Sequence, residues 1–409
     1  MLKNESRGTS MAKWTEYALE DLLSYEQPTP YIVESTDYND NYKTPVLTAG
    51  KSFIIGYTNE TNGIYDKLPV IIFDDFTTST QYVNFPFKVK SSAMKILTAN
   101  TDLVLPKFIF YRMQTIEFDH STHKRYWIQQ YSKIKVKIPS LPEQEKIIAK
   151  IEELFSELDN GVETLKKAKQ QLTVYRQAVL KEAFEGKFTI HTSCNMELPW
   201  ASKEDTKSLP DIPQEWQYIA LSNLGDLGRG KSKHRPRNDP KLFEDGKYPF
   251  LQTSEVKSAK RYITEYSKMY GEVGLQQSKL WPKGTLCITI AANIAETAFL
   301  GIDACFPDSV VGFTPYEYIL PEYVKHFIES QKLRLWAFAP ATAQKNINLD
   351  TLENLIVPYC SLEEQKNVIS EIEARMTICD NIEKTVDTAL QQAEAMRQSI
   401  LKKAFEGEL

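Results

Sequence analysis

Residues 225–232 read GDLGRGKS and satisfy the GxxxxGK[ST] pattern of a nucleotide-binding phosphate loop. Such a loop requires a buried strand before it and a helix after it, because the loop amides and the helix N-terminus hold the phosphates. The residues that follow, KHRPRNDPKL, contain two prolines and show no apolar period, which argues against a helix. We therefore favour a basic loop here and keep an NTPase as the enzyme-class alternative.

Acidic residues and histidines elsewhere do not complete a catalytic or metal site. Asp74 and Asp75 end an apolar run, as acids that hold magnesium do, but they lie about 150 residues before the phosphate-loop pattern. A turn at the end of a strand is the favoured interpretation. His120 and His123 match no established metal-ligand spacing and favour a surface loop. The sequence shows no serine elbow, no histidine paired with a nucleophile and no adenine-methylation tetrad.

Basic and polar residues with interleaved aromatic rings remain as candidates for a binding function. Arginine and lysine suit phosphates and guanine edges, while glutamine and asparagine suit adenine. In the C-terminal half, the residues that we predict to contact DNA are Arg229, Lys231, Lys233, His234, Arg235, Arg237, Gln252, Lys257, Lys260, Arg261, Gln344, Lys345 and Asn346.

The N-terminal half contains a comparable stretch, HSTHKRYWIQQ, at residues 120–130. Each such run taken alone would be interpreted as a solvated loop. Both halves place one at the same distance before a repeated helix, described below, and this favours DNA contact. The predicted residues of this half are Thr77, Thr78, His123, Lys124, Arg125, Tyr126 and Gln129.

An internal repeat positions these loops. Residues 141–186 and 362–407 align without a gap at a constant offset of 221, and 20 of the 46 pairs are identical. Each copy follows a different, mostly unrelated stretch. A period this long with two copies excludes a solenoid and indicates two variable modules, each followed by the same helical element.

Apolar residues recur every three or four positions in both copies, which predicts long helices with an a/d seam. The seam residues are Ile148, Ile151, Phe155, Leu158, Val162, Leu165, Leu172 and Val179, and then Ile369, Ile372, Met376, Cys379, Val386, Leu390, Ala393 and Ile400. Both copies end in Ala-Phe-Glu-Gly, where glycine is the usual helix stop. At 1.5 Å per residue, each helix forms a rod of roughly 60 Å.

Polar exceptions in the seam suggest that the two copies face each other. Lys169 of the first copy matches Leu390 of the second, and Val162 matches Glu383. A narrow seam suits a coiled-coil partner better than a broad core face. We predict an α+β protein with two globular modules at the ends of a long antiparallel two-helix coiled coil that is pseudo-twofold symmetric. The alternative is that each helix packs on its own module.

Weak sequence similarities predict that the two modules are copies of one α+β fold. Thr44-Pro45-Val46-Leu47 resembles Tyr248-Pro249-Phe250-Leu251. Leu105-Pro106, in a helix predicted at Val104–Met113, matches Leu320-Pro321 before a helix predicted near Glu322–Trp336.

The bulk composition suits two domains and a scaffold: 409 residues, 42% hydrophobic, 25% charged, with a net charge of -5. This charge argues against a wholly basic nucleic-acid binder, so DNA contact must come from local patches. No stretch has the apolar length of a membrane span, and the N-terminal residues lack the core of a signal peptide. The cysteines form no metal spacing, and we expect reduced, mostly buried thiols in a cytoplasmic protein. They are Cys194, Cys287, Cys305, Cys360 and Cys379.

The motifs at the two ends of the repeated helices carry a resemblance. The helices open with Ile138-Pro139-x-Leu141-Pro142-x-Gln144 and Val357-Pro358-x-x-x-Leu362-x-x-Gln365. They close with Arg176-Gln177-x-x-Leu180-x-x-Ala183-Phe184-x-Gly186 and its copy at Arg397–Gly407. With these motifs, nearly the whole chain resembles the specificity subunit of a type I restriction-modification system.

The resemblance implies a non-catalytic reader of double-stranded DNA. Each module would be a target-recognition domain that reads half of a split sequence, and the helices would form a spacer that docks two methyltransferase subunits. Those partners bind S-adenosylmethionine and flip adenine, and translocase–nuclease subunits that use ATP and magnesium can join them. The resemblance implies no cofactor, no metal and no membrane for this chain. A coiled-coil adaptor without a DNA role is the structural-class alternative.

The expected boundaries are target-recognition domain 1 at 12–139, the first repeat helix at 140–186, a linker at 187–213, target-recognition domain 2 at 214–358 and the second repeat helix at 359–409.

Overall fold

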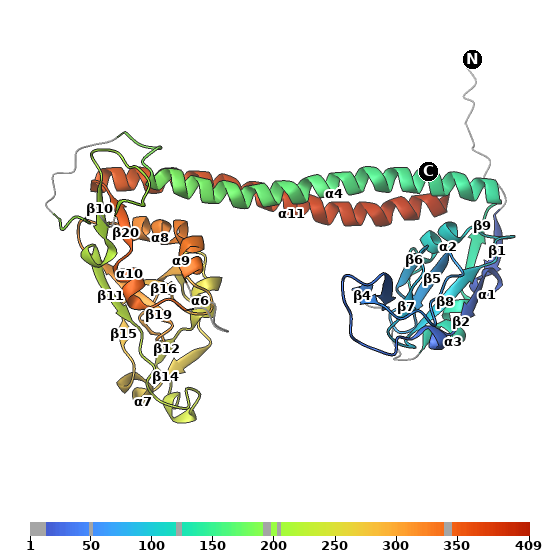
Figure 1. Cartoon of the computed structure of the whole chain (residues 1–409), viewed down its shortest axis with the longest axis horizontal. Coiled ribbons are helices and arrows are strands. Elements are labelled where there is room, and N and C mark those ends of the chain that lie inside the picture. The colour runs from blue at the N-terminus through green and yellow to red at the C-terminus, as the bar shows by residue number, and fades with distance from the viewer. Residues whose placement is uncertain (1–13, 49–51, 120–124, 191–197, 203–205, 339–345) are drawn as a thin grey trace, which may run out of the picture. The chain divides into compact units, whose positions relative to one another are not determined.

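The computed structural model describes residues 14–48, 52–119, 125–190, 198–202, 206–338 and 346–409. The chain forms two compact units: unit 1 contains residues up to Lys166 together with Val386–Leu409, and unit 2 contains Lys167–Thr385. Each unit holds one module of strands and short helices and a segment of each of two long helices, α4 (Leu141–Phe184) and α11 (Leu362–Glu406) (Figure 1). The predicted α+β class is confirmed.

Module 1, the part of unit 1 before α4, contains sheets in the orders β2-β8-β5-β6 and β4-β3-β7. All five residues of β5, VIIFD, are buried, which explains why the first four are apolar. The strands are β2 (Leu23–Glu26), β3 (Thr44–Leu47), β4 (Ile54–Thr58), β5 (Val70–Asp74), β6 (Thr80–Val83), β7 (Lys88–Val89) and β8 (Met94–Ala99).

Module 2, the part of unit 2 before α11 and after α4, contains sheets in the orders β11-β19-β16-β17-β13 and β14-β12-β18-β15. The strands are β11 (Gly225–Arg229), β12 (Tyr248–Phe250), β13 (Tyr262–Ile263), β14 (Lys268–Tyr270), β15 (Leu280–Trp281), β16 (Leu286–Thr289), β17 (Thr297–Leu300), β18 (Ala304–Cys305) and β19 (Val310–Pro315).

The two modules share one topology. The order β2-β8-β5-β6 corresponds to β11-β19-β16-β17, and β4-β3-β7 corresponds to β14-β12-β18. Directions agree as well, because β3–β7 and β12–β18 are parallel pairs while β3–β4 and β12–β14 are antiparallel. The predicted match of residues 44–47 with 248–251 therefore holds in the structure, and the prediction of one fold in two copies is confirmed.

A two-stranded antiparallel sheet leads into each long helix. In unit 1 it pairs β1 (Thr15–Ala18) with β9 (Lys135–Ile138), and in unit 2 it pairs β10 (Gln217–Ala220) with β20 (Ile356–Tyr359). The short helices are α1 (Leu19–Leu22), η1 (Thr29–Tyr31), α2 (Pro106–Met113), α3 (Tyr126–Gln129), η2 (Tyr131–Lys133), η3 (Leu221–Asn223), η4 (Pro240–Leu242), α6 (Thr253–Ser258), α7 (Glu272–Gln276), α8 (Pro321–Ser330), α9 (Lys332–Phe338) and α10 (Leu349–Glu353).

Prolines and glycines mark the helix ends as the sequence predicts. Pro106 and Pro321 occupy the first positions of α2 and α8, where the missing N–H costs nothing. Gly186 (φ 73°) and Gly407 (φ 78°) adopt the left-handed conformation just after α4 and α11. The single helix predicted near 322–336 is wrong in extent, because α8 ends at Ser330 and α9 begins at Lys332.

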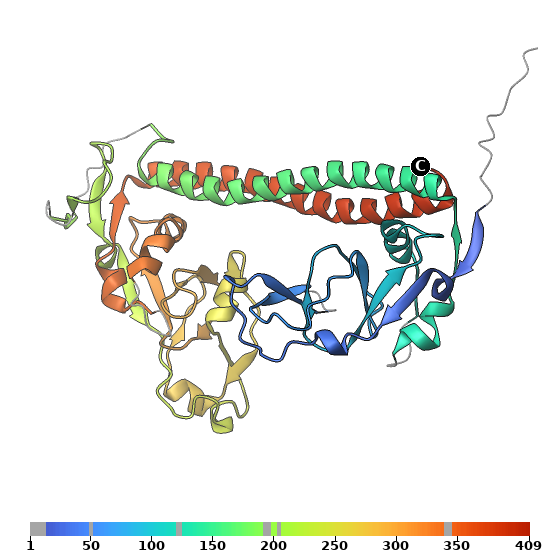
Figure 2. The ribbon, with the colours of Figure 1, turned by 45° about the vertical axis from the view of Figure 1, so that its right-hand side comes forward.

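Within each unit, the segments of the two long helices lie side by side and antiparallel (Figure 2). In unit 1, Ile151 and Phe155 form one buried cluster with Leu401 and Ala404. In unit 2, Lys169 lies 3.5 Å from Glu383 and Arg176 lies 2.7 Å from Asp380. Residue numbers fall on α11 as they rise on α4 in both units, and every predicted seam residue is buried or half-buried. The predicted seam is confirmed, and helix-to-helix pairing replaces the alternative of packing on modules alone.

Candidate nucleic-acid interface

Three predicted DNA-contacting residues of module 2 meet at one polar hollow. Arg229, Arg237 and Asn346 line this hollow of about 200 Å³ together with Asp308. Arg229 ends β11, Arg237 lies in the loop after it, and Asn346 pairs with Ala291 in an isolated β-bridge. Segments more than 100 residues apart in the sequence thus present two guanidinium groups and one amide to the same space.

Asp308 fixes the two arginines of this hollow. Its backbone carbonyl accepts hydrogen bonds from Nε and Nη2 of Arg229 at 2.9 and 2.7 Å. Its carboxylate accepts from Nη2 of Arg237 at 2.8 and 3.1 Å. Such pairing holds planar guanidinium groups in set orientations, which suits contact with a phosphate or a guanine edge. No sequence pattern indicates this role of Asp308, because it depends on a contact across 71 residues.

Lys231, Lys233 and Arg235 of the basic loop are exposed, and the loop backbone is held by neighbouring side chains. The Gln277 side chain accepts from the backbone N–H groups of Lys233 and His234 at 2.6 and 3.0 Å. The His234 ring lies 2.8 Å from Asp239 and holds the pKa of that carboxyl below its ordinary value. Lys231 and Arg235 are exposed beside them. The loop therefore presents its cations to solvent from an ordered backbone.

The phosphate-loop pattern does not form a phosphate loop. Its first five residues are strand β11, paired antiparallel with β19, and no helix follows. Packing explains its glycines. A Cβ at Gly228 would lie 2.8 Å from the Trp281 ring, and one at Gly230 would lie 2.3 Å from the Phe306 carbonyl oxygen. The NTPase alternative thus lacks the geometry it requires.

The cations around α6 have different surroundings. Lys257 is exposed, with Nζ 3.4 Å from the Asn293 side chain, and Lys260 is exposed. Gln252 caps α6, and its N–H donates to Glu255 at 3.1 Å. Arg261 donates to Glu322 at 3.1 Å and to Glu373 of α11 at 3.2 Å. These ion pairs give Arg261 a role in joining module 2 to its long helix, while its predicted DNA contact stays a prediction.

In module 1, the predicted threonines form the turn between β5 and β6. Asp74 Oδ1 accepts from the N–H groups of Phe76 and Thr77 at 2.8 and 3.2 Å, and Thr78 has a φ of 56°. The interpretation of Asp74 as a turn residue is confirmed. Phe76, for which the sequence predicted no DNA contact, is 48% exposed at this turn.

Asp75 is buried and ties the turn to the segment around α3. Its carboxylate lies 3.3 Å from Lys95 Nζ, with both side chains 1% exposed, and it accepts from the Trp127 N–H at 2.9 Å. Arg125 and Gln129 are exposed on this segment. The four predicted residues Thr77, Thr78, Arg125 and Gln129 therefore lie on two segments that Asp75 joins.

The structure contradicts the predicted DNA contact of Tyr126. Its side chain is 2% exposed and packs edge-to-face on Phe118 with centroids 4.9 Å apart, so the ring belongs to the core and does not stack on bases. The basic and aromatic composition of the stretch concealed this inward position. His123 and Lys124, and likewise Gln344 and Lys345, lie outside the described residues.

One backbone contact is shared by both modules and defines equivalent edges. The Tyr126 N–H donates to the Asp75 carbonyl at 3.0 Å, and the Ile347 N–H donates to the Ile290 carbonyl at 2.9 Å. Asp75 follows β5 and Ile290 follows β16, which are equivalent strands. We call this pairing of the turn after β5 or β16 with the later segment the recognition edge of each module. Arg125 in module 1 is thus equivalent to Asn346 in module 2.

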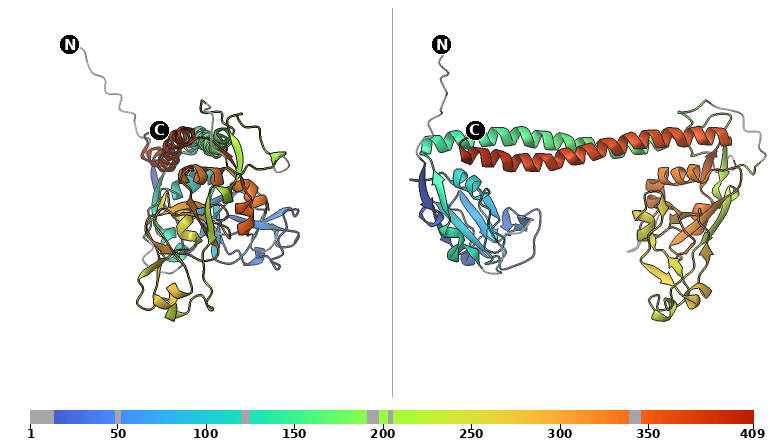
Figure 3. Two further views of the ribbon diagram at one scale, coloured as in Figure 1. Left: turned by 90° about the vertical axis from the view of Figure 1, so that its left-hand side faces the viewer. Right: turned by 180° about the vertical axis from the view of Figure 1, so that it is seen from behind.

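A buried glutamine at the start of each long helix fixes it to its module. Gln144 accepts from the Leu105 N–H at 2.8 Å and donates to the carbonyls of Leu103 and Pro139 at 3.0 and 2.9 Å. Gln365, its repeat counterpart, accepts from the Leu320 N–H at 2.8 Å. Both side chains are fully buried. In unit 1 the end of α11 lies beside the start of α4 (Figure 3). There Phe405 of α11 packs on Phe108 of α2 with ring centroids 5.2 Å apart, so the second helix also contacts the module.

Other classes of site receive no support from the described residues. Within them, no three histidine, cysteine, aspartate or glutamate side chains gather as metal ligands, and no helix has the length and apolarity to cross a membrane. The four described cysteines are buried and free, and burial raises the pKa of the Cys287 and Cys305 thiols.

Comparisons with known proteins agree with this organisation. The family model described as Type I restriction modification DNA specificity domain matches residues 11–173 and 213–392. The specificity subunit of the type I restriction enzyme EcoR124I/EcoR124II of Escherichia coli is 31% identical over 388 residues, which are 89% of this chain and 87% of that protein.

Two solved structures share the fold. A chain from work on complex assembly and conformational transition of the type I restriction-modification system has a TM-score of 0.70 at 16% identity, covering 97% of this chain and 98% of that one. The HsdS subunit from Thermoanaerobacter tengcongensis has a TM-score of 0.54 at 16% identity and 97% coverage of each chain.

Proposed function

This chain belongs to the type I restriction-modification DNA specificity family, and we propose how its modules and helices divide the work of that specificity subunit. The chain is a non-catalytic DNA-recognition component with two recognition domains. Each module reads one half of a bipartite double-stranded target through its recognition edge. The single observation that carries this proposal is the shared backbone contact, Tyr126–Asp75 and Ile347–Ile290, on edges whose side chains differ.

The chemistry of the two edges differs as two half-sites require. In module 2, Arg229, Arg237 and Asn346 offer two guanidinium groups and one amide, which suit phosphate, guanine and adenine contacts. In module 1, the exposed Phe76 ring and the Arg125 guanidinium are the groups at the corresponding edge. An apolar ring at a turn can contact a thymine methyl or enter between base steps.

The helices hold the modules and dock partners. The repeated ends of α4 and α11 favour a partner present in two copies, and we propose two methyltransferase subunits, with translocase–nuclease subunits joining them. S-adenosylmethionine, ATP and magnesium belong to those partners in this proposal, and the complex works on DNA in the cytoplasm. The expected domain boundaries, 12–139, 140–186, 187–213, 214–358 and 359–409, stay predictions.

Replacement of Arg237 tests the recognition edge of module 2. If Arg237 reaches a phosphate, Arg237→Ala should weaken binding on all sequences and reduce the salt slope by about one. If it reaches a guanine edge, the loss should be roughly 1–3 kcal/mol and should relax one base position of one half-site. Lys247→Ala, an exposed lysine paired with Glu272 outside the hollow, is the matched control. If Arg237→Ala leaves the affinity, the salt slope and the methylated motif unchanged, this edge does not contact DNA.

Exchange of a whole module tests the division of the target. A chain whose residues 14–139 come from a relative should change one half of the methylated motif, read by sequencing the methylated bases of a host. A change in both halves would contradict independent reading. A chain that binds its methyltransferase but selects no sequence would favour the adaptor alternative.

A further inference from the structure

One backbone hydrogen bond closes both the turn after β5 in module 1 and the equivalent turn after β16 in module 2. The Asp74 N–H donates to the Ser79 carbonyl at 2.8 Å, and the Thr289 N–H donates to the Glu296 carbonyl at 3.0 Å. Both donors are the last residues of their strands. The closure encloses four residues in module 1, 75–78, and six in module 2, 290–295. The closure is therefore shared, whereas the enclosed residues differ in number and type.

The last enclosed residue adopts the same left-handed conformation in both turns. Thr78 has a φ of 56° and Ala295 a φ of 62°. Their N–H groups donate to the carbonyls of Asp74 and Thr289 at 2.9 and 2.8 Å. Ala292, in the middle of the longer turn, also has a φ of 62°. Of the four non-glycine residues with positive φ in the described part of the chain, three lie in these two turns. Such strained conformations concentrate where a function requires them.

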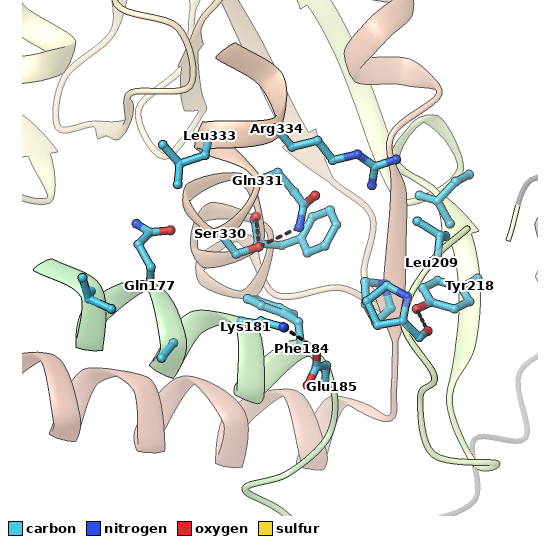
Figure 4. A pocket seen from close by; sticks show the side chains of 16 residues that line it. Gln177, Lys181, Phe184, Glu185, Leu209, Tyr218, Ser330, Gln331, Leu333 and Arg334 are labelled. Atoms are coloured by element: carbon cyan, nitrogen blue, oxygen red, sulfur yellow. Dashed lines mark hydrogen bonds and ion pairs between the residues drawn. The ribbon is translucent and has the colours of Figure 1, made fainter. Parts of the chain in front are cut away.

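Buried contacts hold the turn of module 2 in place. Thr289 is fully buried, and its Oγ1 donates to the Asn293 carbonyl and accepts from the Glu296 N–H at 3.0 Å. The Glu296 carboxylate accepts from Lys332, the first residue of α9, at 2.8 Å. With α8, α9 also forms one wall of a pocket of about 510 Å³, opposite the last turns of α4 (Figure 4). The base of the turn is thus tied to the helices around the end of α4, which restricts the positions of its middle.

The middle of each turn presents one side chain that suits contact with a base. In module 1 this is Phe76, which is 48% exposed and whose N–H donates to Asp74 Oδ1 at 2.8 Å. In module 2 it is Asn293, which is half-buried, with Oδ1 3.4 Å from Nζ of the exposed Lys257. An apolar ring suits the methyl group of thymine, and an asparagine amide can both donate and accept at the edge of adenine.

The turn of module 2 also borders the cations of its recognition edge. Ile290 and Ala291, its first two residues, line the polar hollow of about 200 Å³ together with Arg229 and Arg237. The enclosed residues 290–295 themselves carry no charge. Cations attract the phosphates of any sequence, whereas a neutral amide beside them can select a base. The turn therefore lies where base contacts are needed.

We propose that these two turns determine the sequence specificity, with Phe76 reading a base pair of one half-site and Asn293 a base pair of the other. Thr78 and Ala295 fix the backbone that positions them. This inference rests on the proposed function, in which each recognition edge reads half of the target. Because the closure is formed by backbone groups, the same fold can enclose different residues and read different bases.

Substitution of Asn293 tests the turn of module 2. The full chain, purified with its methyltransferase partner, is mixed with duplexes that carry the motif methylated by the unaltered complex, each altered at one position. Asn293→Ala should reduce discrimination at one position of one half-site by about tenfold, and so should Asn293→Asp, which keeps the shape but removes the amide donor. Discrimination at the other positions should stay unchanged. Asn354→Ala, an exposed asparagine outside the turn, is the matched control.

The backbone of the same turn can be tested without removing the amide. Ala292 is exposed, so a larger side chain there meets no steric obstacle from burial. Ala292→Val should lower discrimination at the position read by Asn293, because a β-branched residue disfavours a φ of 62°. Ala292→Gly should keep the discrimination, because glycine adopts this conformation without strain.

Substitution of Phe76 tests the turn of module 1 in the same assay. Phe76→Ala should relax one position of the other half-site alone, and Phe76→Leu, which keeps an apolar side chain, should retain part of the preference. Ile54→Ala, at an apolar residue of β4 that is 40% exposed, is the control and should keep the whole motif.

The outcomes separate the inference from the function on which it rests. A preference that stays unchanged in Asn293→Ala or in Phe76→Ala would overturn the proposal for that module and leave the recognition function standing. A loss of affinity that is equal for all duplexes would assign the residue to a phosphate contact or to the stability of the fold, and it also overturns the proposal. An unaltered complex that selects no sequence would overturn the proposed function itself.

Discussion

Arg176 and Asp380 form an ion pair between α4 and α11, with 2.7 Å between Nη2 and Oδ1. The 221-residue offset maps Arg176 onto Arg397 and Asp380 onto Asp159, and Arg397 pairs with Asp159 in unit 1. The two ion pairs are therefore one interaction that the repeat forms twice. Such reciprocity arises when two copies of a helix pair antiparallel with the same register, so it identifies the pairing that the sequence specifies.

Charge reversal should show that this pair sets the register. Asp380→Arg should lower stability by about 0.2–1 kcal/mol, because the pair is partly exposed, and Arg176→Asp added to it should restore part of the loss. Denaturant unfolding of the two single variants and the double variant measures the coupling. Additive losses in the double variant would show that the residues act independently.

Replacing either buried glutamine should lower the stability more than replacing these surface charges. Gln144→Ala leaves the Leu105 N–H without its acceptor, and Gln365→Ala does the same to the Leu320 N–H. Each should lower the free energy of unfolding by about 1–3 kcal/mol. Gln170→Ala, an exposed glutamine on α4, is the control and should change stability by less than about 0.5 kcal/mol. Equal losses of stability in Gln144→Ala and Gln170→Ala would show that the buried hydrogen bonds of Gln144 do not stabilise the fold.

The scaffold could be predicted from the sequence because its signals are periodic and local. The spacing of Ile151, Phe155 and their repeats fixes a helix face, and Gly186 fixes a helix end, without knowledge of the modules. The recognition edges could not be predicted to the residue. The Tyr126 N–H is bonded to Asp75, which follows β5, and Arg261 is paired with Glu373, 112 residues away on α11. Side-chain direction in loops depends on such long-range contacts.

The roles of Asp75 and Asp308 could not be predicted for the same reason, because they depend on long-range contacts. Both are acidic residues in polar stretches, which favour a surface turn when taken alone. Only the folded chain places Asp75 beside the buried ammonium of Lys95 and Asp308 between two arginines. The sequence identified the basic residues of the module 2 hollow but not the acid that orients them.

The polar exceptions of the seam distinguish the two halves of the helical pair. Lys169 lies 3.5 Å from Glu383 in unit 2, and the repeat places the apolar residues Leu390 and Val162 at the matching positions of unit 1. Two copies of α4 paired antiparallel would place Lys169 against Val162. Two copies of α11 would place Glu383 against Leu390. The ion pair therefore favours pairing of α4 with α11.

Giving both halves of the seam the same apolar pair should remove the preference for pairing α4 with α11, without loss of stability. Lys169→Leu with Glu383→Val copies the apolar pair of unit 1 and should be neutral or stabilising, since apolar side chains of similar volume can replace a partly buried ion pair. Glu383→Val alone should destabilise by about 1 kcal/mol, because Lys169 and Arg176 both lose a partner. Thermal unfolding compares the variants. A double variant less stable than Glu383→Val alone would contradict this account.

Glu329 should give module 2 a specific response to acid. Burial alone would raise the pKa of this carboxyl, but the His326 ring at 3.0 Å and the Lys325 ammonium at 2.7 Å outweigh it and lower the pKa from 4.5 to about 2. A carboxyl with a depressed pKa in the folded state contributes stability above its unfolded pKa. That contribution is lost as the pH falls from about 4.5 towards 2.

Glu329→Gln isolates this contribution. At pH 7 we expect the variant to be less stable by roughly 1–3 kcal/mol, because a hydrogen-bonded charge is replaced by a neutral amide. The difference from the unaltered chain should stay constant above pH 5 or so and shrink below pH 4.5, since protonation of Glu329 then removes the same interactions. Denaturant unfolding at pH values from 2 to 7 measures both chains, with the exposed Glu317→Gln as control. A difference that persists unchanged to pH 2, or one that widens on acidification, would show that the His326 and Lys325 contacts do not stabilise the ionised carboxyl.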